Sequence, residues 1–246
     1  MASTNLEVEQ KFVLKTPDAV RERLQKAGWV EESCIDMVDW YFDVILDEEQ
    51  TYYPLIRQDC WLRYRSKQPN EGAWELKKGT QSGTKKSSRA TVYEELEGEQ
   101  ALLKVQQLVN AFESVAVPSS LTTSAHPIHD AFAEHDIPQP PMAIAGLVPL
   151  ARLGTQRSSW KHSKENGMVV DLDMTDFGHA VGEVELVCDT STDVEAAQAR
   201  LKAWIESVLD QTTVGPPPMG KLEYYISTKR PDVYQVLVEE GLLPDR

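Results

Sequence analysis

Segment 6–12 reads Leu-Glu-Val-Glu-Gln-Lys-Phe, and it restricts the fold more than any other part of the chain. Successive side chains of a β-strand point to opposite faces, so a strand here puts Glu7, Glu9 and Lys11 on one face and the apolar side chains on the other. Such a charged face cannot pack in an apolar core, so it either faces solvent or lines a wet cavity that holds an ion. At a rise of roughly 3.3 Å per residue, the two carboxylates are roughly 7 Å apart and can share a hard cation such as Mg²⁺.

The same alternation of charged and apolar residues returns along the chain. It predicts further strands at 35–43, 60–65, 74–77, 91–96, 156–160, 169–174, 181–187 and 221–226. Helical patterns are expected at 16–28, 97–113 and 193–209 and from residue 231 onward. The simplest explanation is a sandwich or barrel whose charged faces are solvated. We favour a closed sheet with its charges inside, because the apolar stripes of the helices need a surface to cover and because arginines and carboxylates concentrate on different strands.

Composition restricts the classes of partner and the cellular compartment. The 246 residues include 39 acidic and 25 basic side chains, for a net charge of −14, which argues against a general nucleic-acid binder because such proteins carry a basic face. The three cysteines, Cys34, Cys60 and Cys188, are scattered and indicate neither a disulfide framework nor a zinc site. No apolar leader follows Met1 and no run of about 18 apolar residues exists, so we expect a soluble, cytoplasmic protein without a membrane partner. A monomer is expected as well, although these patterns do not report on oligomeric state.

Residues 116–150 contain six prolines that interrupt any long element. The segment could mark a domain boundary. Because the alternating pattern that precedes it resumes after it, we interpret it as a proline-rich insertion in a single domain that spans residues 1–246.

A cavity lined by both signs of charge suits a linear polyphosphate. Arginine and lysine bind phosphate oxygens, while clustered carboxylates repel one another and need a cation such as Mg²⁺, which also binds phosphate. The acids of this set are Glu7, Glu9, Glu75, Glu95, Asp171, Asp173, Glu183 and Glu185, and the bases are Lys11, Arg63, Arg65, Lys77, Arg157 and Lys221. The pattern leaves open whether Asp173 takes part or is merely solvated. No Walker A sequence is present, so a P-loop is not expected.

These motifs, in this order, resemble the CYTH superfamily of triphosphate tunnel metalloenzymes, whose signature is ExExK. The resemblance rests on segments 7–11, 61–65, 74–77, 170–173 and 182–185, and on Glu95, Arg157 and Lys221. Within the superfamily the chain is most similar to the animal thiamine triphosphatases, notably at 6–12, at 171–185 and at 221–234. The similarity implies a closed eight-stranded antiparallel barrel, a tunnel with helices packed outside it, in an α+β fold.

The resemblance also implies roles for individual residues. It implies a hydrolase that converts thiamine triphosphate to thiamine diphosphate and phosphate with Mg²⁺, or alternatively Mn²⁺. The metal would be held by Glu7, Glu9, Asp171, Glu183 and Glu185. The substrate would be bound by Lys11, Arg63, Arg65, Lys77, Arg157, Asp171, Glu183 and Lys221, with Tyr41 and Trp61 at the thiamine end. Catalysis is expected to involve Glu7, Glu9 and Lys11, with either a second cation or one of the two carboxylates orienting the attacking water.

Three alternatives to a thiamine triphosphate hydrolase stay open. The first is an inorganic tripolyphosphatase of the same fold with little preference for thiamine. The second is a non-catalytic module that binds polyphosphate or a nucleotide, although a pure binder would not need so many carboxylates. An adenylyl cyclase of the superfamily is a remote third, because segments 61–63 and 176–185 fit it poorly.

Overall fold

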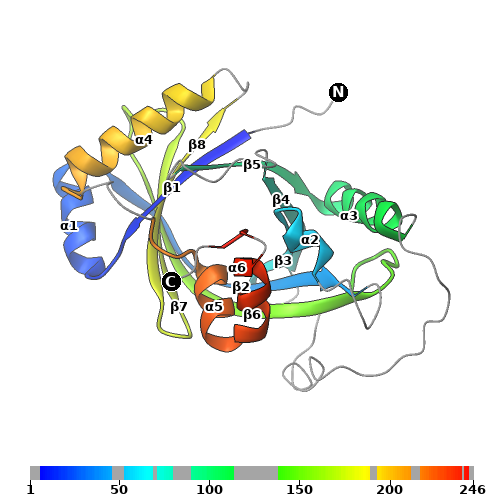
Figure 1. The fold of residues 1–246 in the computed structure, drawn as a ribbon. Helices are drawn as coiled ribbons and strands as arrows, with labels where there is room; N and C mark the ends of the chain where they lie inside the picture. The colour runs from blue at the N-terminus through cyan, green and yellow to red at the C-terminus, as the bar shows by residue number, and fades with distance from the viewer. Residues whose placement is uncertain are drawn as a thin grey trace. The chain divides into compact units, whose positions relative to one another are not determined.

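The computed structural model describes residues 6–45, 53–68, 71–79, 90–113, 138–188, 193–211, 217–239 and 241–243. Eight strands form a closed barrel in the order β1-β5-β4-β3-β2-β6-β7-β8, accompanied by helices (Figure 1). The prediction of an α+β fold with a closed eight-stranded antiparallel barrel is therefore confirmed. The chain divides into two compact units. The first unit comprises Met1–Met37, Gly79–Glu95 and Leu153–Arg246, and the second comprises Val38–Lys78 and Leu96–Arg152.

The strands and helices follow the sequence pattern closely. The strands are β1 (Leu6–Val13), β2 (Val30–Val44), β3 (Cys60–Gln68), β4 (Glu71–Gly79), β5 (Ala90–Glu97), β6 (Leu147–Lys161), β7 (Met168–Thr175) and β8 (Ala180–Cys188). The helices are α1 (Pro17–Lys26), α2 (Pro54–Arg57), α3 (Gly98–Glu113), α4 (Val194–Val208), α5 (Lys221–Lys229) and α6 (Pro231–Glu239). None of the helices in the described part of the chain is long and apolar enough to cross a membrane.

Within the described residues, the segment that begins at Lys221 contradicts the element prediction, because it forms helix α5 and not a strand. Leu222 and Ile226 are both buried in α5. Their spacing of four residues puts them on one face of a helix. The tyrosines between them favoured a strand by propensity, which is a weaker guide than burial of the apolar face.

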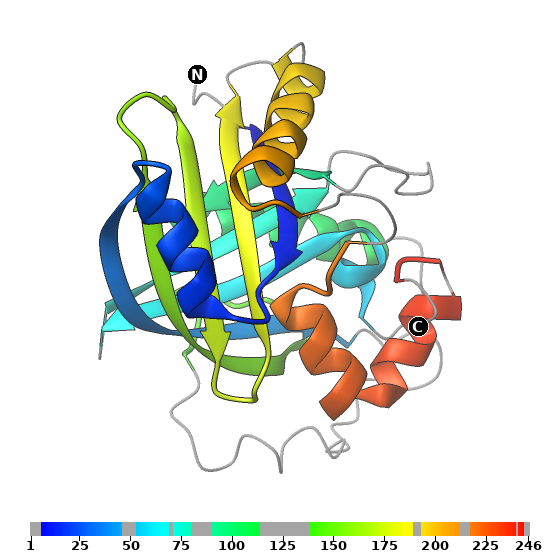
Figure 2. The ribbon, with the colours of Figure 1, turned by 90° about the vertical axis from the view of Figure 1, so that its left-hand side faces the viewer.

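In the first unit, the apolar face of β1 is covered by helices. Val8 and Phe12 are buried in one cluster with Trp29 and with Trp204 of α4. The Phe12 and Trp204 ring centroids are 6.2 Å apart. Figure 2 shows α1 and α4 lying across the same face of the neighbouring strands β1, β7 and β8. The charged side chains of β1 therefore lie on the face opposite these helices.

A glycine in β8 lets one of these core rings lie against the sheet. Gly182 lies opposite Phe12 in the β1–β8 ladder. A Cβ atom on Gly182 would lie 2.0 Å from Phe12 Cε2, which no pair of non-bonded carbons tolerates. The glycine of the segment Gly-Glu-Val-Glu is therefore required by packing on the apolar face, while its glutamates serve the other face.

In the second unit, β3 and β4 pack their apolar face against α2 and α3. Leu62, Leu76 and Leu102 belong to one buried cluster of this unit. Helix α2 is fastened by Asp43, whose Oδ1 accepts a hydrogen bond from the Leu55 amide and whose Oδ2 accepts one from the Ile56 amide, both at 3.0 Å. Burial raises the pKa of Asp43 to about 7, although these backbone bonds work to lower it.

The proline-rich segment lies mostly outside the described residues, which resume at Pro138 and lead into β6. The interpretation of residues 116–150 as an insertion in a single domain therefore stays a prediction.

Candidate active site

Polar side chains line up across four neighbouring strands of the first unit. Lys11 of β1 lies opposite Glu183 of β8, Glu183 lies opposite Asp171 of β7, and Asp171 lies opposite Ser159 of β6. Ser159 Oγ donates a hydrogen bond of 2.7 Å to Asp171 Oδ1, and Lys11 Nζ lies 3.5 Å from Glu183 Oε1. The alternation seen in each strand therefore becomes a continuous polar row once the strands are in register.

A second interaction of Lys11 joins it to a carboxylate of its own strand, β1. Lys11 Nζ forms an ion pair with Glu9, and Thr91 Oγ1 of β5 donates a hydrogen bond of 3.1 Å to Glu9 Oε1. Burial works to lower the pKa of Lys11, but Glu9 and Glu183 raise it above its ordinary value. Lys11 is therefore held as a cation beside carboxylates of two strands.

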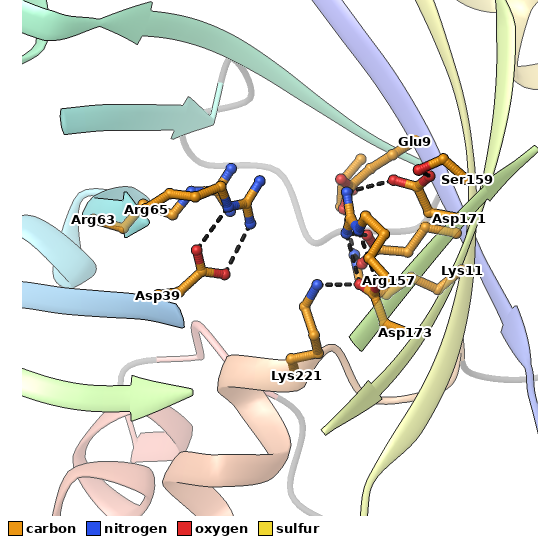
Figure 3. A network of polar contacts seen from close by, with 12 residues as sticks. Glu9, Lys11, Asp39, Arg63, Arg65, Arg157, Ser159, Asp171, Asp173 and Lys221 are labelled. Atoms are coloured by element: carbon orange, nitrogen blue, oxygen red, sulfur yellow. Dashed lines mark hydrogen bonds and ion pairs between the residues drawn. The ribbon is translucent and has the colours of Figure 1, made fainter. Parts of the chain in front are cut away.

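Arg157 of β6 contacts three carboxylates, and Figure 3 shows two of them, Asp171 and Asp173. Its Nε and Nη2 atoms donate hydrogen bonds of 2.7 and 2.6 Å to the two oxygens of Asp173. Nη1 forms an ion pair with Asp171, and Nη2 lies 3.2 Å from Glu183 Oε2. Burial works to lower the pKa of Arg157, and Asp173, Asp171 and Glu183 together raise it. One guanidinium thus balances charge from both β7 and β8.

Lys221, the first residue of α5, reaches the same group of charges. Its Nζ forms an ion pair with Asp173. Burial of Asp173 would raise the pKa of that carboxyl, but Arg157 and Lys221 lower it below its ordinary value. Burial likewise works to raise the pKa of Glu183, and Lys11 and Lys221 lower it. A helix residue therefore completes a cluster that otherwise comes from strands.

We call this group the ionic network. It consists of Glu9, Lys11, Arg157, Asp171, Asp173, Glu183 and Lys221. Two further predicted residues lie next to it on the strands. Glu185 of β8 lies opposite Glu9, and Glu7, two residues before Glu9, is buried as well.

The second unit holds its own pair of arginines. Arg65 of β3 donates hydrogen bonds of 2.7 and 2.8 Å to the two oxygens of Asp39 of β2, which is fully buried (Figure 3). Arg63 Nε donates a hydrogen bond of 2.7 Å to Glu75 Oε2 of β4. Arg63 Nη1 also donates one of 3.4 Å to the Tyr41 hydroxyl. Both guanidinium groups are therefore fixed in direction by neighbouring strands.

The other predicted residues of the second unit lie close by in the ladder. Trp61 of β3 lies opposite Lys77 of β4, and both side chains are only partly buried. The Trp61 indole donates a hydrogen bond of 2.9 Å to Asp59 Oδ1. The orientation of the Trp61 ring is therefore set by a carboxylate two residues before it.

Two acids carry much of this structure: Asp173, whose role the sequence pattern left open, and Asp39, which the sequence analysis did not assign to the site. Asp173 holds both Arg157 and Lys221, and Asp39 holds Arg65 in a two-bond pair. Each lies at a charged position of an alternating strand, and that pattern was the available signal. What the sequence lacks is the strand register, which places Asp39 opposite Arg65 and Asp173 opposite Arg157.

The carboxylates suit a hard divalent cation by their chemistry, since they offer only oxygen ligands. Burial raises the pKa of Asp171 more than Arg157 and Ser159 lower it. An added positive charge would therefore stabilise the ionised form of this carboxylate. Across the described ranges, however, no three acidic, histidine or cysteine side chains are arranged to hold a metal ion. The carboxylates of the ionic network are paired with lysine and arginine, so a metal there would have to compete with these cations for carboxylate oxygens.

Comparison with known proteins agrees with the geometry. The model of the CYTH domain matches residues 5–211. Human thiamine-triphosphatase is 31% identical over 97% of this chain and 92% of its own length, and the Macaca fascicularis thiamine-triphosphatase matches to the same extent. CYTH triphosphatases depend on a metal ion in general.

Solved structures share the fold at low identity. A protein of Pyrococcus horikoshii has a TM-score of 0.53 at 13% identity, covering 92% of this chain and 99% of that one. A Hippeastrum protein with a dominant triphosphatase activity has a TM-score of 0.52 at 16% identity, covering 92% of this chain and 96% of that one. At these identities the likeness concerns the fold alone.

Proposed function

The chain belongs to the CYTH family, and on that premise we propose that it hydrolyses the terminal phosphate of thiamine triphosphate, giving thiamine diphosphate and phosphate. The observation that carries this proposal is the ionic network, in which lysine, arginine and carboxylate side chains share one buried region of the first unit. An anion alone would pair only with the lysine and arginine side chains, and a metal ion alone would pair only with the carboxylates. A triphosphate bound together with a cation suits both sets.

The cations are the groups that we assign to the phosphates. Lys11, Arg157 and Lys221 now donate to carboxylate oxygens, and phosphate oxygens can accept the same hydrogen bonds. The planar fork of Arg157 makes a two-bond contact with Asp173, a geometry that also fits phosphate. Arg63, Arg65 and Lys77 of the second unit are proposed as further phosphate ligands, and Asp171 and Glu183 as acids that complete the substrate-binding set.

Metal binding is assigned to carboxylates of β1, β7 and β8. The proposed ligands are Glu7, Glu9, Asp171, Glu183 and Glu185. Mg²⁺ is the proposed ion, with Mn²⁺ as an alternative, and when bound it offsets charge on the phosphoryl group and the leaving diphosphate. The Lys11 ammonium stabilises the negative charge of the transferred group, and Glu7 or Glu9 orients the attacking water.

Tyr41 and Trp61 are the proposed contacts for the organic end of the substrate. A thiazolium cation over an indole face is attracted by roughly 0.5–2 kcal/mol. Trp61 is only partly buried and its ring is held by Asp59, which leaves an oriented aromatic face for such a contact. Tyr41 is buried, and its hydroxyl accepts from Arg63.

The decisive experiment is a substrate panel measured with and without Mg²⁺ or Mn²⁺. We expect metal-dependent phosphate release, with kcat/KM higher for thiamine triphosphate than for tripolyphosphate and for ATP. A preference for tripolyphosphate would replace the proposal with the tripolyphosphatase alternative. Binding of these compounds without any phosphate release under either metal would indicate a non-catalytic module.

The variant Glu9→Gln tests the metal assignment. It keeps the size of the side chain and its contact with Thr91 but removes the charge, so metal-dependent turnover should fall by about 100-fold. The variant also loses the ion pair with Lys11, but Lys11 keeps Glu183 as a partner, so the melting temperature should fall by less than in Arg157→Met and the protein should stay folded. Glu32→Gln is the matched control, because Glu32 forms an exposed pair with Lys161. Unchanged turnover in Glu9→Gln would remove this residue from the metal site.

We also propose a monomeric state and a cytoplasmic location, without nucleic-acid or membrane partners. The net charge of −14 supports the lack of a nucleic-acid partner.

A further inference from the structure

We propose that His179 is a positioning residue that holds the start of α5 and thereby keeps the Lys221 ammonium on Asp173. His179 lies in the turn between β7 and β8, and α5 lies beside that turn in both ribbon views (Figures 1 and 2). The inference deepens the proposed function and rests on it, because Lys221 can act on a substrate only if the ionic network binds one.

The backbone of His179 is fixed to the end of β7. The Thr175 amide and the Thr175 hydroxyl both donate to the His179 carbonyl, at 2.9 and 2.8 Å, and the His179 amide donates to Thr175 Oγ1 at 2.9 Å. Thr175 is two residues after Asp173 on the same strand. The strand that carries the partner of Lys221 therefore also fixes the position of the histidine.

The imidazole reaches across to the segment before α5. His179 Nε2 lies 2.9 Å from the carbonyl oxygen of Met219, two residues before Lys221. A carbonyl only accepts hydrogen bonds, so Nε2 must carry the proton in this contact. Burial lowers the pKa of His179, although the bond to Met219 works to raise it, so the ring donates as a neutral imidazole.

The flat face of the same ring holds the first turn of α5. The His179 and Tyr224 rings are stacked, with centroids 4.2 Å apart and planes at 10°. Phe177 of the same turn stacks with Tyr224 at 6.2 Å and 17°. Tyr224 is three residues after Lys221, so contacts before and after Lys221 both lead back to the β7–β8 turn.

The start of α5 lies close to the Lys11 side chain of β1. A Cβ atom on Gly220 would lie 3.0 Å from Lys11 Cε, so the backbone just before Lys221 passes close to the side chain of a residue of the ionic network. The Lys221 side chain is 6% exposed. Loss of the His179 contacts should therefore first increase the exposure of the Lys221 amine.

The first test measures the exposure of that amine and needs no substrate. Wild type and His179→Ala are treated briefly with acetic anhydride, and acetylation of Lys221 is compared by mass spectrometry with that of exposed Lys202 in the same sample. Acetylation of Lys221 should rise about tenfold relative to Lys202 in the variant, a change in the range of coupling between contacting groups. His162→Ala is the matched control, since this histidine packs on Trp29 away from α5 and its loss should leave Lys221 protected.

A second readout uses turnover and asks whether His179 acts through Lys221. His179→Ala should lower kcat/KM for tripolyphosphate in the wild-type background and change it less than about twofold in a Lys221→Ala background. Equal losses in both backgrounds would show a general structural role and overturn the inference. His179→Phe keeps the stack on Tyr224 and removes only the bond to Met219, so it takes the place of His179→Ala if the latter does not fold.

The two readouts separate failure of the inference from failure of the proposed function. A wild-type protein that releases no phosphate would contradict the proposed function, while the acetylation result would still decide the role of His179. Unchanged acetylation of Lys221 in a folded His179 variant would overturn the inference, as would an equal rise in His162→Ala.

Discussion

Replacing Arg157 with methionine should reveal how strongly the ionic network depends on one guanidinium. Methionine keeps much of the length of the side chain but removes the charge and the donors. Arg157 makes two hydrogen bonds to Asp173, one ion pair with Asp171 and one contact with Glu183. All three carboxylates would then remain at buried or partly buried positions, two of them almost fully buried.

The size of the effect follows from what each carboxylate retains. Asp173 keeps Lys221, Glu183 keeps Lys11, and Asp171 keeps only the hydroxyl of Ser159. Removing one partner of a buried ion pair costs roughly 3–5 kcal/mol, and since two of the three acids stay paired we expect about 3 kcal/mol. For a chain of this size, that loss lowers the melting temperature by about 6–12 °C.

Thermal and urea unfolding of Arg157→Met, at pH 7 without substrate, measure this loss. Arg157→Lys should give an intermediate value, because an ammonium restores the charge but not the two-bond geometry with Asp173. Arg200→Met is the control, since Arg200 pairs with Glu165 on the surface and should cost less than about 1 kcal/mol. A destabilisation of Arg157→Met no larger than that of Arg200→Met would refute the reasoning.

Three further changes probe other parts of the molecule. Gly182→Ala should destabilise the protein by about 1–3 kcal/mol in urea unfolding, because its Cβ would overlap the ring of Phe12, and an unchanged midpoint would contradict the packing argument. The pKa of Asp43 is raised to about 7, so the folded state binds its proton more tightly than the unfolded state. The free energy of unfolding should therefore fall by roughly 4 kcal/mol as the pH rises from about 4 to 7, and Asp43→Asn should abolish that slope. Trp61→Ala should lower kcat/KM for thiamine triphosphate by about 2–30-fold but leave tripolyphosphate hydrolysis nearly unchanged, and equal losses would remove Trp61 from thiamine recognition.

Much of the fold was predictable because its strands follow from the local alternation of charged and apolar residues. In β1, β7 and β8 each charged residue is separated from the next by one uncharged residue, and those strands form where the pattern predicts them. Their apolar faces are also the faces that α1 and α4 cover. Periodicity of two residues and burial of one face are both local properties of the sequence, so no partner strand had to be known.

The sequence predicts less about residues whose role depends on partners that are far away along the chain. Lys221 could be assigned to the site by family resemblance, yet its element was wrong, because a short helix with two tyrosines has the composition of a strand. Asp39 and Asp173 were visible as charged positions, but their importance arises from pairing with Arg65 and Arg157 across ladders. The contacts of His179 with Met219 and Tyr224 join segments about 40 residues apart, and no local pattern reports them.

The pairing of β1 on both sides has a consequence for solubility. Its backbone is hydrogen-bonded to β5 along one edge and to β8 along the other. Loss of Leu6–Val13 would leave two long rows of unpaired amides and carbonyls, the kind of surface on which strands of separate molecules add to each other. The eight residues that include Glu7, Glu9 and Lys11 thus also protect β5 and β8 from edge-to-edge association with other molecules. A chain that lacks these residues should therefore aggregate, and its loss of activity could not be assigned to the missing side chains alone.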